Sequence, residues 1–162
     1  MDTLITDALR FAQGTRETAE PVALLAYVSQ VLETFDQPIE LCSTIDDDLV
    51  VNLAPNAFSR VLANLVGNGI KYANTVRVTL SDTEIVVLDD GPGIPEAERG
   101  SVFQPFYRLE ASRNQSTGGS GLGLAVVQQL SATHGWQIDI KDSQLGGAAF
   151  HWCFADSQAA QE

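Results

Sequence analysis

Basic residues are scarce in this sequence. Its 162 residues include 9 Lys and Arg against 21 Asp and Glu, which gives a formal net charge of −12. A general nucleic-acid surface needs a basic face to neutralise phosphates, so the composition excludes nucleic acid as a partner. If the chain binds phosphate, it has to do so locally, through backbone amides, a metal ion and a few chosen cations.

Cysteines and long apolar runs are also scarce. The two cysteines, Cys42 and Cys153, lack CxxC spacing, so we expect reduced thiols, and a disulfide between them is the less favoured alternative. No apolar run approaches the ~18–20 residues of a membrane-spanning helix, and the start of the chain lacks the basic region of a secretory signal. The sequence therefore predicts one domain without direct membrane contact, since domains usually run ~100–200 residues.

The spacing of apolar residues predicts both helices and strands. Helices are predicted over residues 1–13, 21–35 (with Pro21 in its first turn), 55–73 and 122–134, and strands over 39–44, 49–53, 76–80, 85–88, 137–141 and 148–154. Short connections predict hairpins for the first two strand pairs, and the aspartates at 46–48 are interpreted as a solvated turn in preference to a metal cluster. This mixture predicts a two-layer α/β sandwich, with helices packed on a mixed, mostly antiparallel sheet.

The helix predicted over 55–73 contains the segment NLVGNGIKY. Asn64 and Asn68 are four residues apart and Lys71 follows three later, so the three side chains share one helix face. Amide oxygens suit Mg²⁺ and an ammonium suits phosphate, so this face could hold a metal ion and a polyphosphate; a merely solvated polar face is the alternative. Gly69 costs the helix roughly 1 kcal/mol relative to Ala, which indicates close packing or ligand approach.

Two glycine-rich segments follow. In VVLDDGPGIP a strand leads into Asp89, Gly91 and Gly93, where glycines allow close approach and a carboxylate can accept from an exocyclic amine such as that of adenine. In GGSGLGLAVV a glycine cluster opens the last predicted helix, whose free amides can bind phosphate. Each segment alone is also typical of a tight turn, and the second matches neither a Walker loop nor the Rossmann spacing.

Together, in this order, the three motifs resemble the nucleotide-binding domain of the GHKL superfamily (gyrase, heat-shock chaperone, histidine kinase and mismatch-repair ATPases). The resemblance covers residues 21–154 and implies the Bergerat fold. The segment VFQPFYRLEASR resembles the phenylalanine box of sensor histidine kinases, with Phe103, Phe106 and Arg108 in matching places. Hydrolysing members carry a Glu where this chain has Asn64, and an amide cannot take a proton from water. The chain therefore resembles the ATP-binding catalytic domain of a sensor histidine kinase, in the membrane-sensor subgroup that partners winged-helix response regulators.

The resemblance implies roles for residues of the amide-bearing helix. Asn68 would coordinate Mg²⁺ with Asn64 beside it, and Lys71 would contact a phosphate of ATP, so that Asn64 and Lys71 act in catalysis. Tyr72 would line the nucleotide pocket. Gly69 is usually Ala in the family, which puts only the rigidity of this helix in doubt.

Further roles fall on the glycine-rich segments and on the lid between them, residues 95–119. The resemblance implies that Asp89 accepts from the adenine amino group and that Arg108 reaches the γ-phosphate as a third catalytic residue. Phe103 and Phe106 are interpreted as packing or partner contacts of the lid. The implied pocket and hinge positions are Gly91, Gly93, Ile94, Gly119, Gly121, Leu122 and Gly123.

A larger parent protein is also implied. Residues 1–14 resemble the end of the second helix of a dimerisation and phosphoacceptor hairpin, 15–20 a linker, 21–155 the catalytic domain and 156–162 a disordered tail. Neither His134 nor His151 has the H-E-x-x-T-P context of a phosphoacceptor, so both are interpreted as structural or surface residues. The implied partners are the hairpin, a response regulator and a second copy of the parent. The domain would be cytoplasmic and its parent anchored in the bacterial inner membrane.

Two other functions remain open on the sequence alone. A nucleotide-gated binding module, such as a degenerate kinase or an anti-sigma-like switch, would bind ATP and clamp a partner without phosphotransfer. A GHKL ATPase would release phosphate steadily, which Asn64 disfavours.

Overall fold

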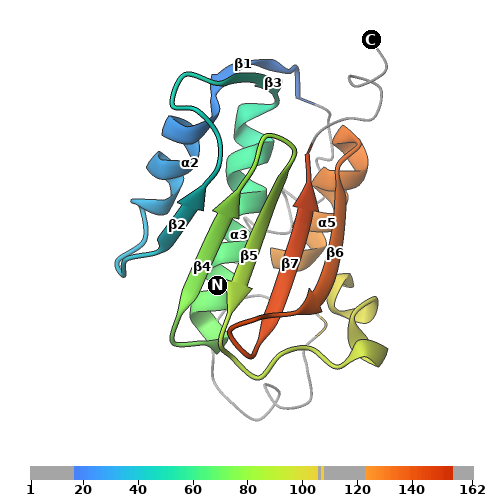
Figure 1. The fold of residues 1–162 in the computed structure, drawn as a ribbon. Coiled ribbons are helices and arrows are strands. Elements are labelled where there is room, and N and C mark those ends of the chain that lie inside the picture. Colours follow the sequence, from blue (N-terminus) through green and yellow to red (C-terminus); the bar gives the residue numbers. More distant parts are fainter. Residues whose placement is uncertain (1–16, 106, 108–122, 155–162) are drawn as a thin grey trace.

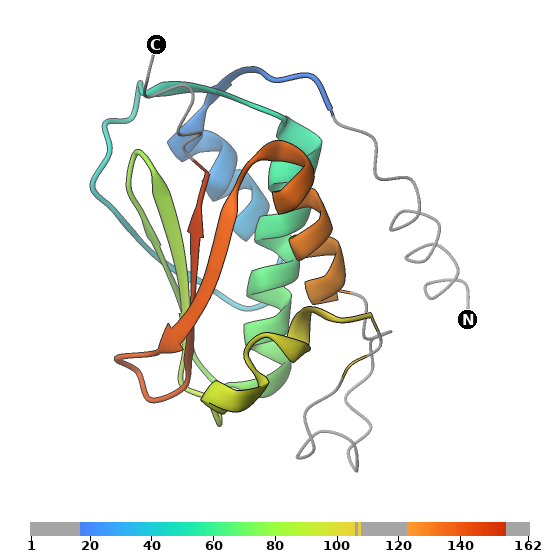
Figure 2. The same cartoon turned by 90° about the vertical axis from the view of Figure 1, so that its right-hand side faces the viewer.

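The computed structural model describes residues 17–105, 107 and 123–154. These residues form a two-layer sandwich in which α-helices cover one face of a five-stranded sheet (Figures 1 and 2). The helices are α2 (Leu24–Leu32), α3 (Pro55–Tyr72) and α5 (Gly123–His134). The predicted fold class is confirmed, whereas the predictions for residues 1–16 and 155–162 lie outside the described residues.

The large sheet has the strand order β2-β4-β5-β7-β6. Strands β2 and β4 run parallel, and all other neighbours in this sheet are antiparallel, which confirms a mixed, mostly antiparallel sheet. The hairpin predicted around residues 81–84 is confirmed as β4 and β5. The strands are β2 (Glu40–Ser43), β4 (Val76–Leu80), β5 (Glu84–Asp89), β6 (Gln137–Asp142) and β7 (Ala148–Cys153).

The burial pattern of β4 shows why one face of the sheet is covered. Val76, Val78 and Leu80 are buried, whereas Arg77 and Thr79 between them are partly exposed. Successive strand side chains point to opposite faces, so the apolar row meets the helices. In the β4–β5 register Asp89 lies opposite the first of these valines, so its carboxylate also points to the helix side.

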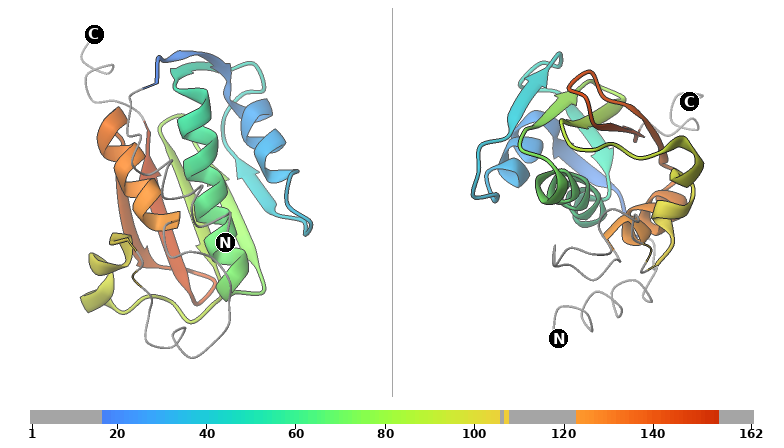
Figure 3. Two further views of the ribbon diagram at one scale, coloured as in Figure 1. Left: turned by 180° about the vertical axis from the view of Figure 1, so that it is seen from behind. Right: turned by 90° about the horizontal axis from the view of Figure 1, so that it is seen from below.

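The centre of the core is an aromatic cluster around Phe58 of α3. Its ring centroid lies 4.6 Å from that of Trp152, 5.4 Å from Phe154 and 6.2 Å from Trp136. These contacts fix the first half of α3 on the sheet, where the helix lies between α2 and α5 (Figure 3). The second half of α3, with the predicted site residues, then extends over the ends of β4 and β5.

Two predictions in the first third of the chain are wrong. Residues 20–23 form strand β1 (Glu20–Ala23), so Pro21 lies in a strand and the helix begins only at Leu24. Among the described residues strand β1 pairs with β3 (Val50–Leu53) alone, in a separate two-stranded sheet, and such an edge position tolerates a proline.

The strands predicted at 39–44 and 49–53 do not form a hairpin. Strand β2 joins β4, while β3 joins β1, so the turn at residues 46–48 connects two different sheets. The turn itself is present, since the N–H of Leu49 donates to the carbonyl of Asp46. Within the described residues no three His, Cys, Asp or Glu side chains gather to hold a metal ion, so the preference for a turn over a metal cluster stands.

Two further sequence expectations can be compared with the structure. Cys42 and Cys153 are free thiols, as expected. Across the described ranges, no helix combines the length and apolar content that a membrane span needs. The segment after β5, which includes the start of the predicted lid, contains two short 3₁₀ helices, η1 (Glu96–Glu98) and η2 (Ser101–Phe103), and η2 packs against α5.

Candidate functional site

The end of α3 and the end of β5 approach each other closely. A Cβ built on Gly69 would lie 3.0 Å from Cγ2 of Val76 and 3.7 Å from the Cβ of Asp89. A Cβ on Gly91 would lie 2.7 Å from the carbonyl oxygen of Tyr72. The predicted close packing at Gly69 is therefore confirmed, and Gly91 is required because the turn after β5 passes against the last residue of α3.

The polar face of α3 extends from this junction towards α5. Asn64 and Asn68 are half-buried and Lys71 is exposed. The Oδ1 atom of Asn64 would lie 3.4 Å from a Cβ on Gly123, the first residue of α5. The Nζ of Lys71 lies 5.8 Å from the ring centroid of Tyr72. The structure thus brings the amide-bearing helix, the end of β5 and the start of α5 to one end of the sandwich.

Asp89 is the best-defined side chain of the site. It is only 5% exposed, and its Oδ1 accepts backbone N–H bonds from Gly91 at 2.9 Å and from Ala148 at 3.1 Å. No described residue donates to Oδ2. The carboxylate is therefore fixed through one oxygen and keeps the other as an acceptor for a ligand.

The charge of this carboxylate is under opposing influences. Burial raises the pKa of Asp89 above its ordinary value, the N–H bonds from Gly91 and Ala148 lower it, and the neighbouring charge of Asp90 raises it again. Burial is the largest of these causes, so the charged form is disfavoured before a ligand arrives. A ligand N–H that donates to Oδ2 would favour the charged form, so Asp89 is suited to bind an amine donor.

Gly147 is a site residue that the sequence reading missed. A Cβ at this position would lie 2.1 Å from Oδ1 of Asp89 and 2.6 Å from the nitrogen of Gly91. Both distances are too short for any side chain, so the position requires glycine. Its own N–H donates to the carbonyl of Asp89 at 3.0 Å. In the sequence this residue is marked only by the Gly146-Gly147 pair between the last two strands, and none of the three motifs includes that pair.

Asp90 is the second missed residue. Its Oδ1 accepts the N–H groups of Asn74 and Thr75, both at 2.9 Å, and these bonds are the main reason why the pKa of Asp90 lies below its ordinary value. The two aspartates of the DDGPG segment therefore differ in role. Asp89 faces the site, and Asp90 fastens the connection from α3 to β4.

Glu17 supports the site from a distance. The N-cap residue of α3, Ala54, has no side-chain cap, and the Glu17 carboxylate instead accepts the N–H groups of Asn56 at 3.1 Å and Ala57 at 2.8 Å. The N–H of Glu17 donates to Nε2 of His134 at 3.1 Å. His134 is buried, as its structural interpretation requires.

The remaining predicted residues divide into two groups. Gly93 has a φ of +76°, which favours glycine, and Ile94 and Phe103 are buried in the core. The burial of Phe103 agrees with its interpretation as a packing residue. The predictions for five residues lie outside the described part of the chain: Phe106, Arg108, Gly119, Gly121 and Leu122.

The donor set on α3 fits a Mg²⁺ ion bound together with a polyphosphate. Mg²⁺ keeps several waters and takes only one or two protein ligands beside substrate phosphates. Asn64 and Asn68 lie one helical turn apart and are only half-buried, so their amide oxygens are within reach of such an ion. Asn68 is the predicted ligand, and its side chain makes no hydrogen bond or ion pair within the described residues.

This fold and site define a GHKL-type nucleotide-binding domain. The chain matches the family of histidine kinase-, DNA gyrase B- and HSP90-like ATPases over residues 54–158. The chain belongs to this family, and the resemblance stated from the sequence is confirmed.

Characterised proteins that are similar to this chain include a sensor protein and a histidine-protein kinase. The chain is 32% identical to sensor protein RstB of Escherichia coli (strain K12) over 163 aligned positions, which cover 93% of this chain and 38% of RstB. It is 44% identical to the histidine-protein kinase/phosphatase MprB of Mycobacterium sp. (strain KMS) over 97 positions, 55% of this chain and 18% of MprB. The chain therefore spans well under half the length of these relatives.

Solved structures agree with this assignment. The mycobacterial sensor histidine kinase MprB superposes with a TM-score of 0.65 at 32% identity, covering 83% of this chain and 95% of that chain. Full-length ShkA in complex with AMPPNP superposes with a TM-score of 0.72 at 24% identity, covering 93% of this chain and 34% of that chain, which shows the shared fold.

Proposed function

We propose that this chain is the ATP-binding catalytic domain of a two-component sensor histidine kinase, which transfers the γ-phosphate of ATP to a histidine on a separate hairpin domain. The observation that carries the proposal is Asp89. A buried carboxylate held through Oδ1 by two backbone amides offers a single oriented acceptor, Oδ2. The exocyclic amine of adenine is the matching donor, and guanine presents a carbonyl oxygen at the corresponding position.

The polar face of α3 would serve the phosphates. Lys71 would supply a positive charge to the phosphate chain, and Asn68, with Asn64 beside it, would hold Mg²⁺. When bound, Mg²⁺ would neutralise charge on the phosphate oxygens. In the family pattern Arg108 would reach the γ-phosphate. The adenine pocket would be shaped by Gly91, Gly93 and Ile94. The turn and hinge on the phosphate side would consist of Gly119, Gly121, Leu122 and Gly123.

Asn64 favours phosphotransfer over hydrolysis. Its amide cannot accept a proton, so no base at this position would activate water. Its Oδ1 is 3.4 Å from the position that a Cβ on Gly123 would occupy. The catalytic contribution of this domain would then be positioning and charge neutralisation, while the base beside the acceptor histidine would belong to the hairpin domain.

The parent protein would supply the remaining parts. We expect a homodimeric sensor anchored in the bacterial inner membrane, with this domain on the cytoplasmic side. Its hairpin would accept the phosphoryl group, and a response regulator would take the group onto an aspartate. Because neither His134 nor His151 has the context of a phosphoacceptor, this chain alone would bind nucleotide without autophosphorylating.

Calorimetric titration tests the proposal. The chain is titrated with a non-hydrolysable ATP analogue and with its GTP counterpart, with and without Mg²⁺, and is then mixed with a hairpin domain and ATP. Adenine-selective binding followed by phosphohistidine formation supports the kinase. Binding without transfer supports the nucleotide-gated module, and steady phosphate release supports an ATPase.

The metal assignment has its own test. Asn68→Ala should remove the Mg²⁺ dependence of nucleotide binding, because the predicted ligand is lost. Titrations of the variant with and without Mg²⁺ measure this. If Mg²⁺ still tightens binding as in the wild type, another group holds the ion.

A further inference from the structure

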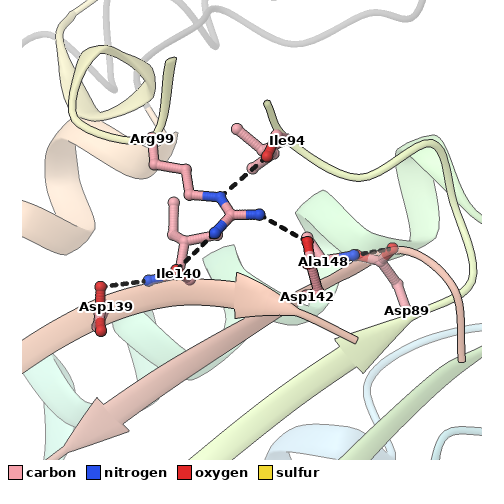
Figure 4. A network of polar contacts seen from close by, with 7 residues as sticks. All are labelled: Asp89, Ile94, Arg99, Asp139, Ile140, Asp142 and Ala148. Atoms are coloured by element: carbon pink, nitrogen blue, oxygen red, sulfur yellow. Dashed lines mark hydrogen bonds and ion pairs between the residues drawn. The ribbon is translucent and has the colours of Figure 1, made fainter. Parts of the chain in front are cut away.

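Arg99 joins two chain segments that meet beside Asp89. It follows η1, and its guanidinium donates from Nε to the carbonyl of Ile94 at 2.9 Å and from Nη2 to Oδ1 of Asp142 at 2.7 Å. A third, longer contact of 3.5 Å runs from Nη1 to the carbonyl of Ile140 on β6. Figure 4 shows the guanidinium between these partners, with Asp89 and Ala148 close by.

The two joined segments are the ones that hold Asp89. The turn at residues 91–94 leaves β5, and its first N–H, from Gly91, donates to Oδ1 of Asp89. Asp142 pairs with Ala148 as the last pair of the β6–β7 hairpin, and the N–H of Ala148 donates to the same oxygen. Each amide donor therefore sits on a segment whose far end is bonded to Arg99.

The two segments approach each other closely through backbone atoms. A Cβ on Gly93 would lie 3.6 Å from the carbonyl carbon of Gly147, so glycine backbones face each other at this point. At this point both segments consist of glycine, so backbone contacts and not side chains meet there. Arg99 supplies directional bonds to both, and its side chain is only 22% exposed, whereas that of Asp142 is 91% exposed.

We infer that Arg99 is a positioning residue for adenine recognition, because it fixes the turn at 91–94 against the β6–β7 turn and thereby keeps both amide donors on Oδ1 of Asp89. This inference rests on the proposed function for its ligand and on the contacts above for its mechanism. Loss of Arg99 would let the carboxylate rotate, so that Oδ2 no longer points at the base. The discrimination between adenine and guanine would therefore decrease.

Titration of variants with the ATP and GTP analogues tests the inference. Arg99→Ala should raise the dissociation constant for the ATP analogue about five- to tenfold, the order of one ordinary hydrogen bond, because Arg99 acts only through the position of Asp89, and should lower the preference for ATP over GTP by a similar factor. Asp142→Ala should act in the same direction but less, because Arg99 keeps its bond to Ile94. Arg99→Lys should restore part of the preference.

Arg77 provides the matched control. It forms a comparable ion pair with Glu40 at 3.0 Å and is 32% exposed, but it joins β4 to β2 on the uncovered face of the sheet. Arg77→Ala should leave nucleotide selectivity unchanged. An unchanged ATP preference in Arg99→Ala, or equal losses in Arg99→Ala and Arg77→Ala, would overturn the inference.

A ligand-free measurement separates this inference from the proposed function. In Arg99→Ala the amide hydrogens of Gly91 and Ala148 should exchange faster with solvent than in the wild type and in Arg77→Ala. If the wild type binds no nucleotide, the proposed function fails while amide exchange still decides whether Arg99 holds the two donors. Unchanged exchange at both amides would refute the role of Arg99.

Discussion

Asp89→Asn changes one oxygen of the buried carboxylate into an N–H₂ donor with almost no change in shape. Oδ1 faces the N–H groups of Gly91 and Ala148, so the amide has to place its carbonyl oxygen there and its nitrogen in the position of Oδ2. A donor would then face the donor of the adenine amine. A hydrogen bond to a charged group contributes about 1.5–3 kcal/mol, so we expect affinity for ATP to fall about 10- to 150-fold.

Stability should change in the opposite direction. Burial raises the pKa of Asp89, so the ionised side chain destabilises the unliganded fold once the pH exceeds its pKa in the unfolded chain, near 3.8. This penalty grows as the pH rises through the raised folded-state pKa and is constant above it. Asp89→Asn removes the penalty, so the free energy of unfolding, measured in urea, should exceed that of the wild type at neutral pH and match it more closely at low pH.

Asp90→Asn is the matched control. Its carboxylate is bonded to the amides of Asn74 and Thr75 in the connection from α3 to β4. Because its pKa is lowered in the fold, its charge stabilises the chain above the unfolded pKa, and this stabilisation is lost as the pH falls through the lowered value. Asp90→Asn should reduce stability at neutral pH and leave nucleotide affinity unchanged. Equal affinities in wild type and Asp89→Asn would refute the adenine assignment, and a variant that loses both affinity and stability would refute the charge argument.

Three other substitutions test the packing that positions the site. Gly147→Ala should lower both the melting temperature and nucleotide affinity, because its Cβ would overlap the site carboxylate, whereas Gly100→Ala, which has open space around it, should change neither in melting and titration assays. Glu17→Ala should lower the free energy of urea unfolding by about 1 kcal/mol, since two α3 amides lose their cap, and an unchanged value would mean that water replaces it. Gly69→Ala gains helix propensity of about 1 kcal/mol but meets Val76, so it should be more favourable in a Val76→Ala background, and strict additivity in urea unfolding would contradict this.

The parts of the fold that the sequence predicted well are those with a strong local pattern. The alternation of Val76, Val78 and Leu80 and the short connection to β5 identify a half-buried hairpin without tertiary information. Strand β1 had no such signal, because Val22 is its single buried residue and continues the apolar spacing of the following helix. The pairing partners of the strands were harder to predict than the strands themselves, because β2 and β3 pair with strands of two different sheets.

The candidate site was predictable to the extent that its residues fall in contiguous motifs. Asp89 and Asn64 stand in such motifs, and the structure brings their segments together. Gly147, Glu17 and Arg99 do not, because each acts on a partner far away in the chain: Ala148, next to Gly147, bonds Asp89 at 59 residues, the Glu17 cap spans 39 and 40 residues, and Arg99 bonds Asp142 at 43 residues. Their roles depend on strand register and helix packing, which local sequence does not specify.

The scarcity of basic residues gives the proposed nucleotide site a particular electrostatic character. A chain with a net charge of −12 repels a polyphosphate at long range, although charges beyond a Debye length of ~8–10 Å are largely screened at physiological ionic strength. Recognition then has to come from groups within contact distance. Backbone amides orient Asp89 without adding net charge, and Lys71 lies on the same helix as the amides of Asn64 and Asn68. Selectivity for the base thus depends on hydrogen-bond geometry. A positioning residue such as Arg99 therefore contributes more to nucleotide selectivity here than it would in a protein whose basic surface itself holds the phosphates.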